Sequence, residues 1–280
     1  MFKTVAILGI GNMGRSIAEG IGRSPDMKNG DIILYNPHAH KAEVVAADLG
    51  NCARIASTPG EAVKEADLVI IAVKPKIVSS LLEEIKGNLK QDDILLSVAA
   101  GVTLEQIESV VGTGRKLVRA MPNTPAVVGA GMTSLTPNEH VSAEEILQIE
   151  ELFSSFGRAE VVDEYLIDAV IGVSGSSPAY VYMFIEALAD GAVASGMPRD
   201  KAYVFAAQTV MGAAKTVLET GEHPGKLKDD VCSPGGTTIA AVRALEERGF
   251  RSAVMEAVMT AAEKSQEMSK KKVNVNQFTK

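Results

Sequence analysis

The first residues whose types and spacing suggest chemistry form a glycine-containing turn near the start of the chain. A G-x-G-x-x-G pattern follows an apolar run at residues 4–8 and comprises Gly9, Ile10, Gly11, Asn12, Met13 and Gly14. The first glycine would permit a tight bend, the second a close approach of pyrophosphate, and the third close packing of a helix on its strand. A helix that begins here directs N–H groups at the anion. Because the pattern lies between a strand-like and a helix-like segment, we prefer a dinucleotide site to a purely structural glycine turn.

The end of the second strand-like run indicates which dinucleotide would bind. An NAD site usually carries Asp or Glu about 20 residues past the turn, where the carboxylate holds the ribose hydroxyls. Here that place holds Asn36, and His38, His40 and Lys41 nearby can add positive charge. We therefore expect NADPH to be preferred, with NADH also usable. Asn36 followed by Pro37 also fits a helix N-cap with proline in the first turn, and the two interpretations are compatible.

Two further segments lie at the carboxyl ends of predicted strands, where open α/β sheets bind ligands. The fourth apolar run leads into Ala72, Val73, Lys74 and Pro75, and the fifth is followed by a small-residue stretch that includes Ala100. Small side chains there leave room for a ribose and a nicotinamide ring. Lys74 fits a contact with the cofactor and a solvated loop position equally well.

Apolar runs and helix-like stretches alternate through the first half of the chain. The strand-like runs lie at residues 4–8, 32–35, 52–56, 68–73 and 94–98, and the helix-like stretches at 12–23, 38–48, 60–66 and 77–89. This alternation is typical of a parallel sheet covered on both faces, and right-handed crossovers make such a sheet doubly wound. We expect further strands at 117–120, 127–135 and 159–162. A helix at 142–155 is supported by a capping box between Ser142 and Glu145.

Strand signals end near residue 163, and helices are predicted at 178–195 and 198–219. The first of these is apolar on nearly all sides, which requires burial on all sides. A bundle this small would not cover it, so we infer burial against another subunit; a core helix within one monomer is the alternative. The predicted fold class is α/β, with an NADP-binding, Rossmann-type doubly wound domain at residues 1–163. An all-helical dimerisation and substrate-binding domain follows at 164–280.

Composition argues against several classes of function. The 280-residue chain has a net charge of −7, which disfavours a nucleic-acid partner. Two cysteines, Cys52 and Cys232, and four histidines show no metal-ligand or disulfide spacing, so we expect no metal centre and reduced thiols in a cytoplasmic protein. No apolar run is long enough to span a bilayer, and the chain opens directly into a strand, so we expect neither a membrane segment nor a signal peptide.

A second glycine-containing segment lies far along the chain, in the run Ser233, Pro234, Gly235, Gly236, Thr237 and Thr238. Two glycines at a loop-to-helix junction expose backbone N–H groups that would suit a carboxylate. The Thr238 hydroxyl is able to hydrogen-bond a ring nitrogen. On these residues alone, an ordinary turn followed by an N-cap explains the pattern at least as well. Ser176 and Ser177 either line the same pocket or cap the apolar helix.

Taken together, these segments resemble the pyrroline-5-carboxylate reductase family. The similarity follows the family's order along essentially the whole chain and is carried by residues 9–14, 72–75, 99–101, 121–125, 174–180 and 228–246. It implies NADPH-dependent reduction of 1-pyrroline-5-carboxylate to L-proline, the final step of proline biosynthesis, by hydride transfer to the imine carbon. It also implies a homodimer that assembles further, commonly into a decamer. The departures are Ser177, where many members have Gly, and the short, irregular strand at 52–56.

The resemblance also implies roles for individual residues. Thr238 would be the catalytic residue beside the substrate nitrogen, and Thr237 would lie near the carboxylate. The other substrate-binding residues would be Ser177, Ser233, Gly235 and Gly236. A protonated cyclic imine already accepts hydride well, so orientation would supply much of the rate, on the order of 7–11 kcal/mol. We expect subunit pairing to bring the dinucleotide at residues 9–14 against the loop at 233–238.

Other functions share parts of this pattern. A β-hydroxyacid or 6-phosphogluconate-type dehydrogenase has a similar first domain but carries a catalytic lysine early in the long helix, and residues 174–186 contain no lysine. A non-catalytic NADP-binding protein would keep the glycine turn without needing the loop at 233–238. An NADPH absorbance assay with the cyclic imine separates that class from a reductase. A reductase of the six-membered ring imine is a third alternative.

Overall fold

In the computed structural model, which describes residues 2–24, 27 and 32–270, the chain divides into two compact units. The first, here called the sheet unit, contains Met1–Gly175 together with Ala261–Lys280. The second, here called the helical unit, is Ser176–Thr260. None of the helices among the described residues has the length and apolar character that a membrane span requires.

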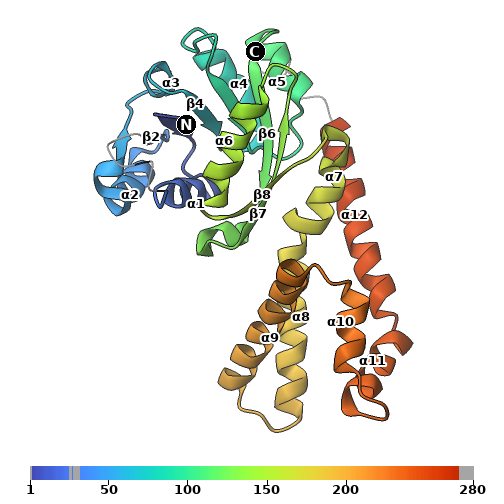
Figure 1. The fold of residues 1–280 in the computed structure, drawn as a ribbon. Coiled ribbons are helices and arrows are strands. Elements are labelled where there is room, and N and C mark those ends of the chain that lie inside the picture. The colour runs from blue at the N-terminus through green and yellow to red at the C-terminus, as the bar shows by residue number, and fades with distance from the viewer. Residues whose placement is uncertain (1, 25–26, 28–31, 271–280) are drawn as a thin grey trace, which may run out of the picture. The chain divides into compact units, whose positions relative to one another are not determined.

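An eight-stranded sheet with the order β3-β2-β1-β4-β5-β6-β7-β8 forms the centre of the sheet unit (Figure 1). Its strands are β1 (Val5–Leu8), β2 (Ile32–Tyr35), β3 (Ala53–Ile55), β4 (Leu68–Ile71), β5 (Ile94–Ser97), β6 (Lys116–Pro122), β7 (Gly131–Pro137) and β8 (Gly157–Val161). The first six strands are parallel, β7 runs antiparallel to β6, and β8 is parallel to β7. The strand order reverses between β1 and β4, and such a switch point is where doubly wound sheets bind ligands.

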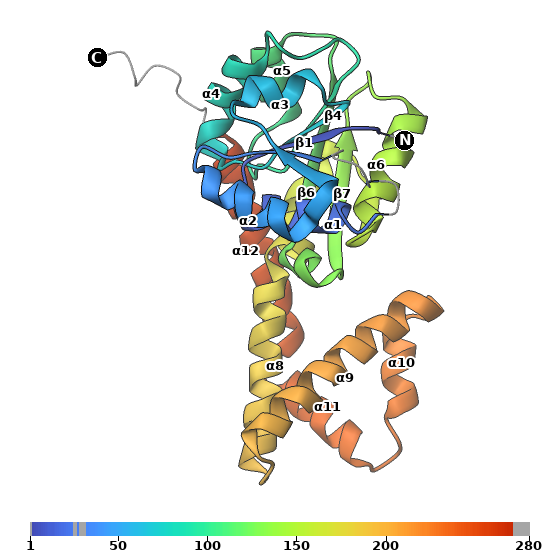
Figure 2. The ribbon, with the colours of Figure 1, turned by 90° about the vertical axis from the view of Figure 1, so that its left-hand side faces the viewer.

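Helices cover both faces of this sheet (Figures 1 and 2). On one face lie α1 (Asn12–Ile21), α2 (Ala39–Leu49) and α6 (Ala143–Ser154). On the other face lie α3 (Pro59–Lys64), α4 (Pro75–Ile85) and α5 (Leu104–Val111). Every residue of β1, β4 and β5 is buried, as expected for strands covered on both sides. The predicted doubly wound architecture is confirmed.

The prediction of a strand from 127 onward is wrong in its first part. Thr124–Val128 instead form a 3₁₀ helix, η2, and β7 begins at Gly131. Pro125 lies in the first turn of η2, where it needs no backbone donor, and Gly129 leaves the helix with a φ of +74°. The chain therefore completes a helical turn and a left-handed residue before it can pair with β6.

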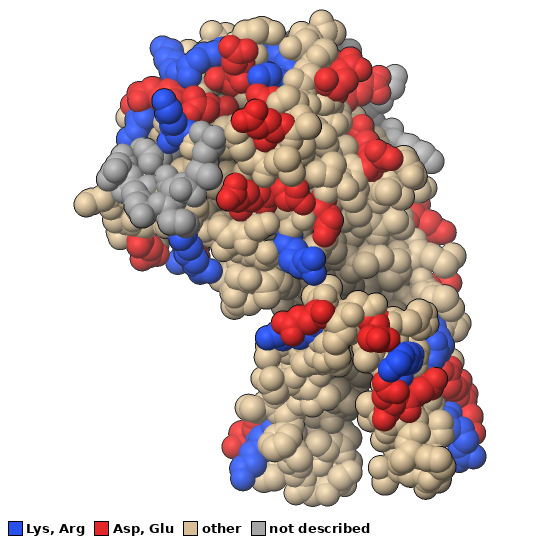
Figure 3. Space-filling model, in the orientation of Figure 1, with Lys and Arg blue, Asp and Glu red and all other residues tan. Residues whose placement is uncertain are grey.

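Five helices build the helical unit: α8 (Ser177–Ala194), α9 (Arg199–Thr220), α10 (Pro224–Val231), α11 (Thr237–Glu247) and the larger part of α12 (Phe250–Lys270). The helices α8 and α9 pack together through Ala189, Ala202 and Ala206 and then diverge (Figure 2). Many of their large apolar side chains are left in solvent; Met183 is 69% exposed and Phe205 62%. Figure 3 shows an uncharged face over the middle of α8 and α9. A single chain therefore leaves this apolar surface uncovered, as the sequence predicted for a dimerising unit.

Candidate active site

The glycine turn connects β1 to α1 at the switch point of the sheet. Gly9 has a φ of +104°, and a Cβ on it would lie 2.7 Å from Val73 Cγ1. A Cβ on Gly14 would lie 2.0 Å from the Gly9 carbonyl oxygen. Gly11 is the N-cap of α1, and no described atom beyond its chain neighbours lies within 4 Å of its Cβ position. Gly9 and Gly14 thus serve the fold itself, whereas Gly11 leaves open space at a helix N-terminus, as a pyrophosphate requires.

Asn36, at the end of β2, is tied directly to this turn. Its Oδ1 accepts a hydrogen bond from the Ile10 N–H at 3.0 Å, and its Nδ2 donates to the His38 carbonyl at 3.0 Å. The prediction that Asn36 caps the following helix is wrong, because its side-chain oxygen is already committed to Ile10. His38 is the N-cap of α2 and makes no side-chain capping bond, and Pro37 lies outside the helix.

The remaining residues of the turn begin α1. Asn12 is its first residue and is exposed, and Met13 is partly buried against the adjoining core cluster. Arg15, the next residue after the turn, pairs with Glu19 and Asp48. Its guanidinium is thus occupied by carboxylates of α1 and α2.

The segment after β4 lies against the glycine turn. The Ala72 N–H donates to the Leu8 carbonyl at 2.8 Å, and a Cβ on Gly14 would lie 3.2 Å from Ala72 Cβ. Lys74 is exposed and is the N-cap of α4, whose first residue is Pro75. The structure thus brings the predicted cofactor residues of the turn and of 72–75 together at one edge of the sheet.

Ala100 belongs to the loop between β5 and α5 and is partly buried. Because β5 pairs with β4 in parallel, with Ser97 opposite Ile71, the segments that follow these strands leave the same edge of the sheet. This places the β5–α5 loop beside residues 72–75. The predicted nicotinamide end of the dinucleotide site thus lies along β4 and β5.

A second candidate site lies in the helical unit, at the start of α11. Gly235 has a φ of +69°, and Gly236 is the N-cap of α11 and donates its N–H to the Ser233 carbonyl at 3.0 Å. No side chain caps this described helix end, and a Cβ on Gly236 would lie 2.4 Å from Ser233 Oγ. Thr237 is exposed and Thr238 half-buried. Main-chain N–H groups beside bare glycines suit a carboxylate without any basic side chain.

The serines that precede the apolar helix take different positions from those of a cap. Ser176 is the N-cap of α8 by position, and Ser177 is the first residue of that helix. Ser176 has a helical backbone (φ −94°, ψ −30°) and makes no side-chain capping bond, so the capping interpretation is wrong for it. The reason is the π-helical turn at Ile171–Gly175, which delivers the chain to α8 in helical conformation.

Two charged residues precede the second site in the chain and pair with each other. Lys228 and Asp229 lie near the end of α10, and their hydrogen bond raises the pKa of Lys228 and lowers the pKa of Asp229. Residues 233–238 contain no titratable side chain. Among the described residues, no cluster of three His, Cys, Asp or Glu side chains is arranged for a metal ion. The loop therefore offers hydroxyls and backbone N–H groups.

A glycine turn at the switch point of a doubly wound sheet defines the class, a dinucleotide-binding α/β oxidoreductase. Residues 4–101 match the family model for "NADP oxidoreductase coenzyme F420-dependent", and residues 164–268 match that for "Pyrroline-5-carboxylate reductase dimerisation". The chain belongs to the pyrroline-5-carboxylate reductase family. Pyrroline-5-carboxylate reductase from Escherichia coli is 53% identical over 270 residues, which cover 96% of this chain and 100% of the relative.

Solved structures of the same family share both the fold and the length. A pyrroline-5-carboxylate reductase from Coxiella burnetii has a TM-score of 0.90 at 33% identity and covers 96% of this chain and 99% of its own. The Plasmodium falciparum pyrroline carboxylate reductase with NADP bound has a TM-score of 0.83 at 32% identity and covers 95% of this chain and 98% of its own. The family similarity therefore extends across both units of the chain.

Proposed function

We propose that this chain reduces 1-pyrroline-5-carboxylate to L-proline with NADPH, the final step of proline biosynthesis. The observation that carries the proposal is the 53% identity to a pyrroline-5-carboxylate reductase across 96% of the chain, which includes both candidate sites. The open space at Gly11 and the main-chain cradle at the start of α11 supply two sites of the right chemistry, one for pyrophosphate and one for a carboxylate.

The cofactor site is assigned to Gly9–Gly14, Asn36, Ala72–Pro75 and Ala100. When bound, NADPH supplies a hydride for the imine carbon. The N–H groups at the start of α1 hold the pyrophosphate, and Gly11 permits its approach. The end of β2 holds Asn36 in place of the acidic residue that would repel a 2′-phosphate, and the exposed Lys41 lies on α2 nearby in sequence. These features favour NADPH over NADH.

The substrate site is assigned to Ser177, Ser233 and Gly235–Thr238. The first N–H groups of α11 bind the carboxylate, and the Thr238 hydroxyl oxygen accepts a hydrogen bond from the protonated ring nitrogen. That proton stays on the nitrogen, and hydride addition to the neighbouring carbon turns the C=N bond of the iminium into the C–N bond of the secondary amine. The chain has to bind the imine, orient it toward the hydride donor and keep water out of the site. No strong acid is needed for this.

The test of this proposal is an NADPH absorbance assay with 1-pyrroline-5-carboxylate. Wild type should consume NADPH and form proline stoichiometrically. Thr238→Ala should lower kcat about tenfold, equivalent to about 1.4 kcal/mol and to one lost hydrogen bond, with NADPH affinity unchanged. Thr238→Ser should retain most of the activity, and Thr113→Ala, in an exposed loop of the sheet unit, serves as the matched control. Unchanged turnover in Thr238→Ala at saturating substrate would remove Thr238 from the mechanism.

The residues matching the dimerisation model identify a homo-oligomer. We propose that dimers assemble further into a ring such as a decamer, and that the enzyme acts in the cytoplasm, where its two cysteines remain reduced. Sedimentation velocity at micromolar concentration should show a species of about ten chains for the decamer. A single species of two chains would contradict the ring. Fractionation of the source cells should recover the protein with the cytoplasmic fraction, and recovery elsewhere would contradict that location.

A further inference from the structure

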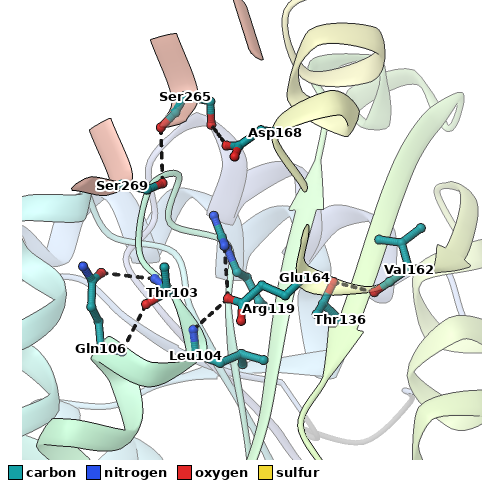
Figure 4. Close-up of polar contacts among 10 residues, drawn as sticks. All are labelled: Thr103, Leu104, Gln106, Arg119, Thr136, Val162, Glu164, Asp168, Ser265 and Ser269. Atoms are coloured by element: carbon teal, nitrogen blue, oxygen red, sulfur yellow. Dashed lines mark hydrogen bonds and ion pairs between the residues drawn. The ribbon is translucent and has the colours of Figure 1, made fainter. Parts of the chain in front are cut away.

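Arg119 is a buried cation that the proposed reaction does not use. It lies on β6, is 3% exposed, and donates from Nη1 to Glu164 Oε1 at 3.2 Å. Within the part of the chain that the structure describes, its Nε and Nη2 have no hydrogen-bond partner. Figure 4 shows the guanidinium directed at Glu164. A charge buried this completely with one partner is costly, so the contact with Glu164 needs a reason beyond folding.

Glu164 joins three segments of the sheet unit through a single oxygen. Its Oε1 accepts from Arg119 and also from the Leu104 N–H at 3.0 Å (Figure 4). Leu104 is the first residue of α5, where a carboxylate is favoured by the helix dipole. The carboxylate comes from η3 (Glu164–Leu166), 60 residues further along the chain. Strand β6, helix α5 and η3 are therefore held at one point.

The loop between β5 and α5 is the segment that this contact fixes. At the strand end, Ser97 Oγ accepts from the Ala99 N–H at 3.3 Å. At the helix end, Thr103 and Gln106 form a capping box, and Glu164 holds the next N–H. Gly101, in the middle, has a φ of +74°. The same loop carries Ala100, which we assign to the nicotinamide end of the cofactor.

We propose that Arg119 and Glu164 are positioning residues that set the β5–α5 loop for NADPH; this rests on the proposed function. Arg119 acts by orienting the Glu164 carboxylate, and Glu164 acts by holding the first turn of α5. Because 37% of the Glu164 side chain is exposed, solvent screens its attraction to the buried Arg119, and the charge pair by itself adds little to stability. Loss of the pair should therefore weaken NADPH binding, whereas loss of a purely stabilising contact should lower only the unfolding midpoint.

The test measures NADPH binding by fluorescence in the absence of imine, together with the unfolding midpoint. Glu164→Ala should raise the NADPH Kd about tenfold, the effect of one charge-assisted hydrogen bond. Glu164→Gln keeps an acceptor for Leu104 and should stay within about threefold of wild type. In turnover, the KM for NADPH should rise in Glu164→Ala while the KM for the imine stays unchanged. A native NADPH Kd in a folded Glu164→Ala protein would overturn the proposal.

A second variant severs the same contact from the helix side. Leu104→Pro removes the N–H donor at the first position of α5, where proline is well tolerated. Thr103 before it already has the extended backbone (φ −84°, ψ 162°) that a following proline requires. This variant should fold and weaken NADPH binding to the same extent as Glu164→Ala. Native NADPH binding in folded Leu104→Pro would count against the proposal even if Glu164→Ala failed to fold.

The matched control is a second ion pair that also ties β6 to the start of a helix. Lys116, also on β6, pairs with Glu145 at 2.6 Å, and Glu145 holds the N-terminus of α6 in a capping box. Glu145→Ala should lower the unfolding midpoint and leave the NADPH Kd unchanged. If this control weakened NADPH binding equally, the effect at Arg119 and Glu164 would be explained by a general loss of stability. Because the NADPH Kd and the unfolding midpoint are measured without imine, a wild type that binds NADPH without reducing the imine would refute only the proposed function.

Discussion

The sheet unit and the helical unit complete their apolar cores in different ways. In the sheet unit, two clusters of buried side chains lie on opposite faces of the sheet and include the packed rings of Phe153 and Phe156. The described cluster of the helical unit contains Ala189, Ala202 and Ala206, all small. Many large apolar side chains on α8 and α9, such as Met183 and Phe205, stay exposed in one chain. The sheet unit thus has a complete apolar core within one chain, whereas the helical unit leaves part of its apolar surface to be covered by a second chain.

This difference shows where each unit obtains its stability. The sheet unit buries its apolar area within one chain, so its stability is independent of concentration. The helical unit needs a second copy to cover its apolar face, so its stability depends on protomer concentration. Changes in the two units should therefore be read with different measurements.

The largest effect is expected from a charge on the apolar face of the helical unit. Met183→Glu places a carboxylate on α8 at a side chain that is 69% exposed in one chain. Burial of an unpaired carboxylate costs several kcal/mol, so assembly should weaken at least about a hundredfold and activity should fall with it. Leu147→Glu, on the sheet unit at 62% exposure, is the control and should remain assembled and active. Light scattering after gel filtration distinguishes the two, and an intact Met183→Glu assembly would show that this face is not a subunit interface.

The next effect separates glycines that serve the fold from the glycine that serves the ligand. Gly14→Ala places a Cβ 2.0 Å from the Gly9 carbonyl oxygen, so it should destabilise the sheet unit by about 1–3 kcal/mol and abolish NADPH binding. Gly11→Ala meets open space and should change stability by less than about 0.5 kcal/mol. Its NADPH Kd should nevertheless rise at least about tenfold. Thermal unfolding and NADPH titration of both variants check this, and a folded Gly11→Ala with native affinity would contradict the pyrophosphate assignment.

A smaller, pH-dependent effect belongs to Glu145. Burial raises the pKa of its carboxyl, but hydrogen bonds from Lys116 and Ser142 outweigh that and lower the pKa overall. The contribution of Glu145 is therefore present above its unfolded pKa of about 4.3 and is lost as pH falls through the lower folded value. Glu145→Ala should cost about 1 kcal/mol at pH 7, and the difference from wild type should shrink below pH of about 4. Urea unfolding at several pH values measures it; a constant difference would contradict the assignment.

The smallest effect, of opposite sign, is expected at Asp93. Burial raises the pKa of its carboxyl despite hydrogen bonds from Lys90. Its contribution to stability is thus present below its unfolded pKa and lost as pH rises through the raised folded value. Asp93→Asn keeps an acceptor for the Lys90 N–H and should stabilise the protein by less than about 1 kcal/mol at pH 7. The same urea series should show no gain near pH of about 3, and a gain that grows on acidification would have the wrong sign.

Much of the sheet unit could be predicted because its signals are local. The apolar runs that became β1, β2 and β4 are continuous and bounded by turn residues, and the glycine pattern specifies its own backbone. The capping box at Ser142 correctly marked the start of α6. Helix α5 was missed, although the capping box of Thr103 and Gln106 was a readable sign of its start.

The contacts that were missed join residues far apart in the chain. Asn36 binds the Ile10 N–H across 26 positions, and Arg119 reaches Glu164 across 45. No periodicity records such pairs, since they depend on which strands become neighbours. An isolated arginine between Val118 and Ala120 in a buried strand was the available sign that a partner carboxylate must exist. The residue roles at 233–238 came from family resemblance, because the loop by itself also reads as an ordinary turn.

The sheet unit is built from two separate stretches of chain, Met1–Gly175 and Ala261–Lys280, so it can be completed only late in synthesis of the protein. Ser265 Oγ donates to Asp168 Oδ1 at 2.5 Å, and a Cβ on Gly101 would lie 3.6 Å from Met268 Cβ. These partners are translated only after the whole of Ser176–Thr260. At about 5–20 residues per second, a nascent sheet unit waits about 4–17 s for them on the ribosome. Nascent chains stalled before residue 261 should therefore be more sensitive to protease around Gly101 than released chains.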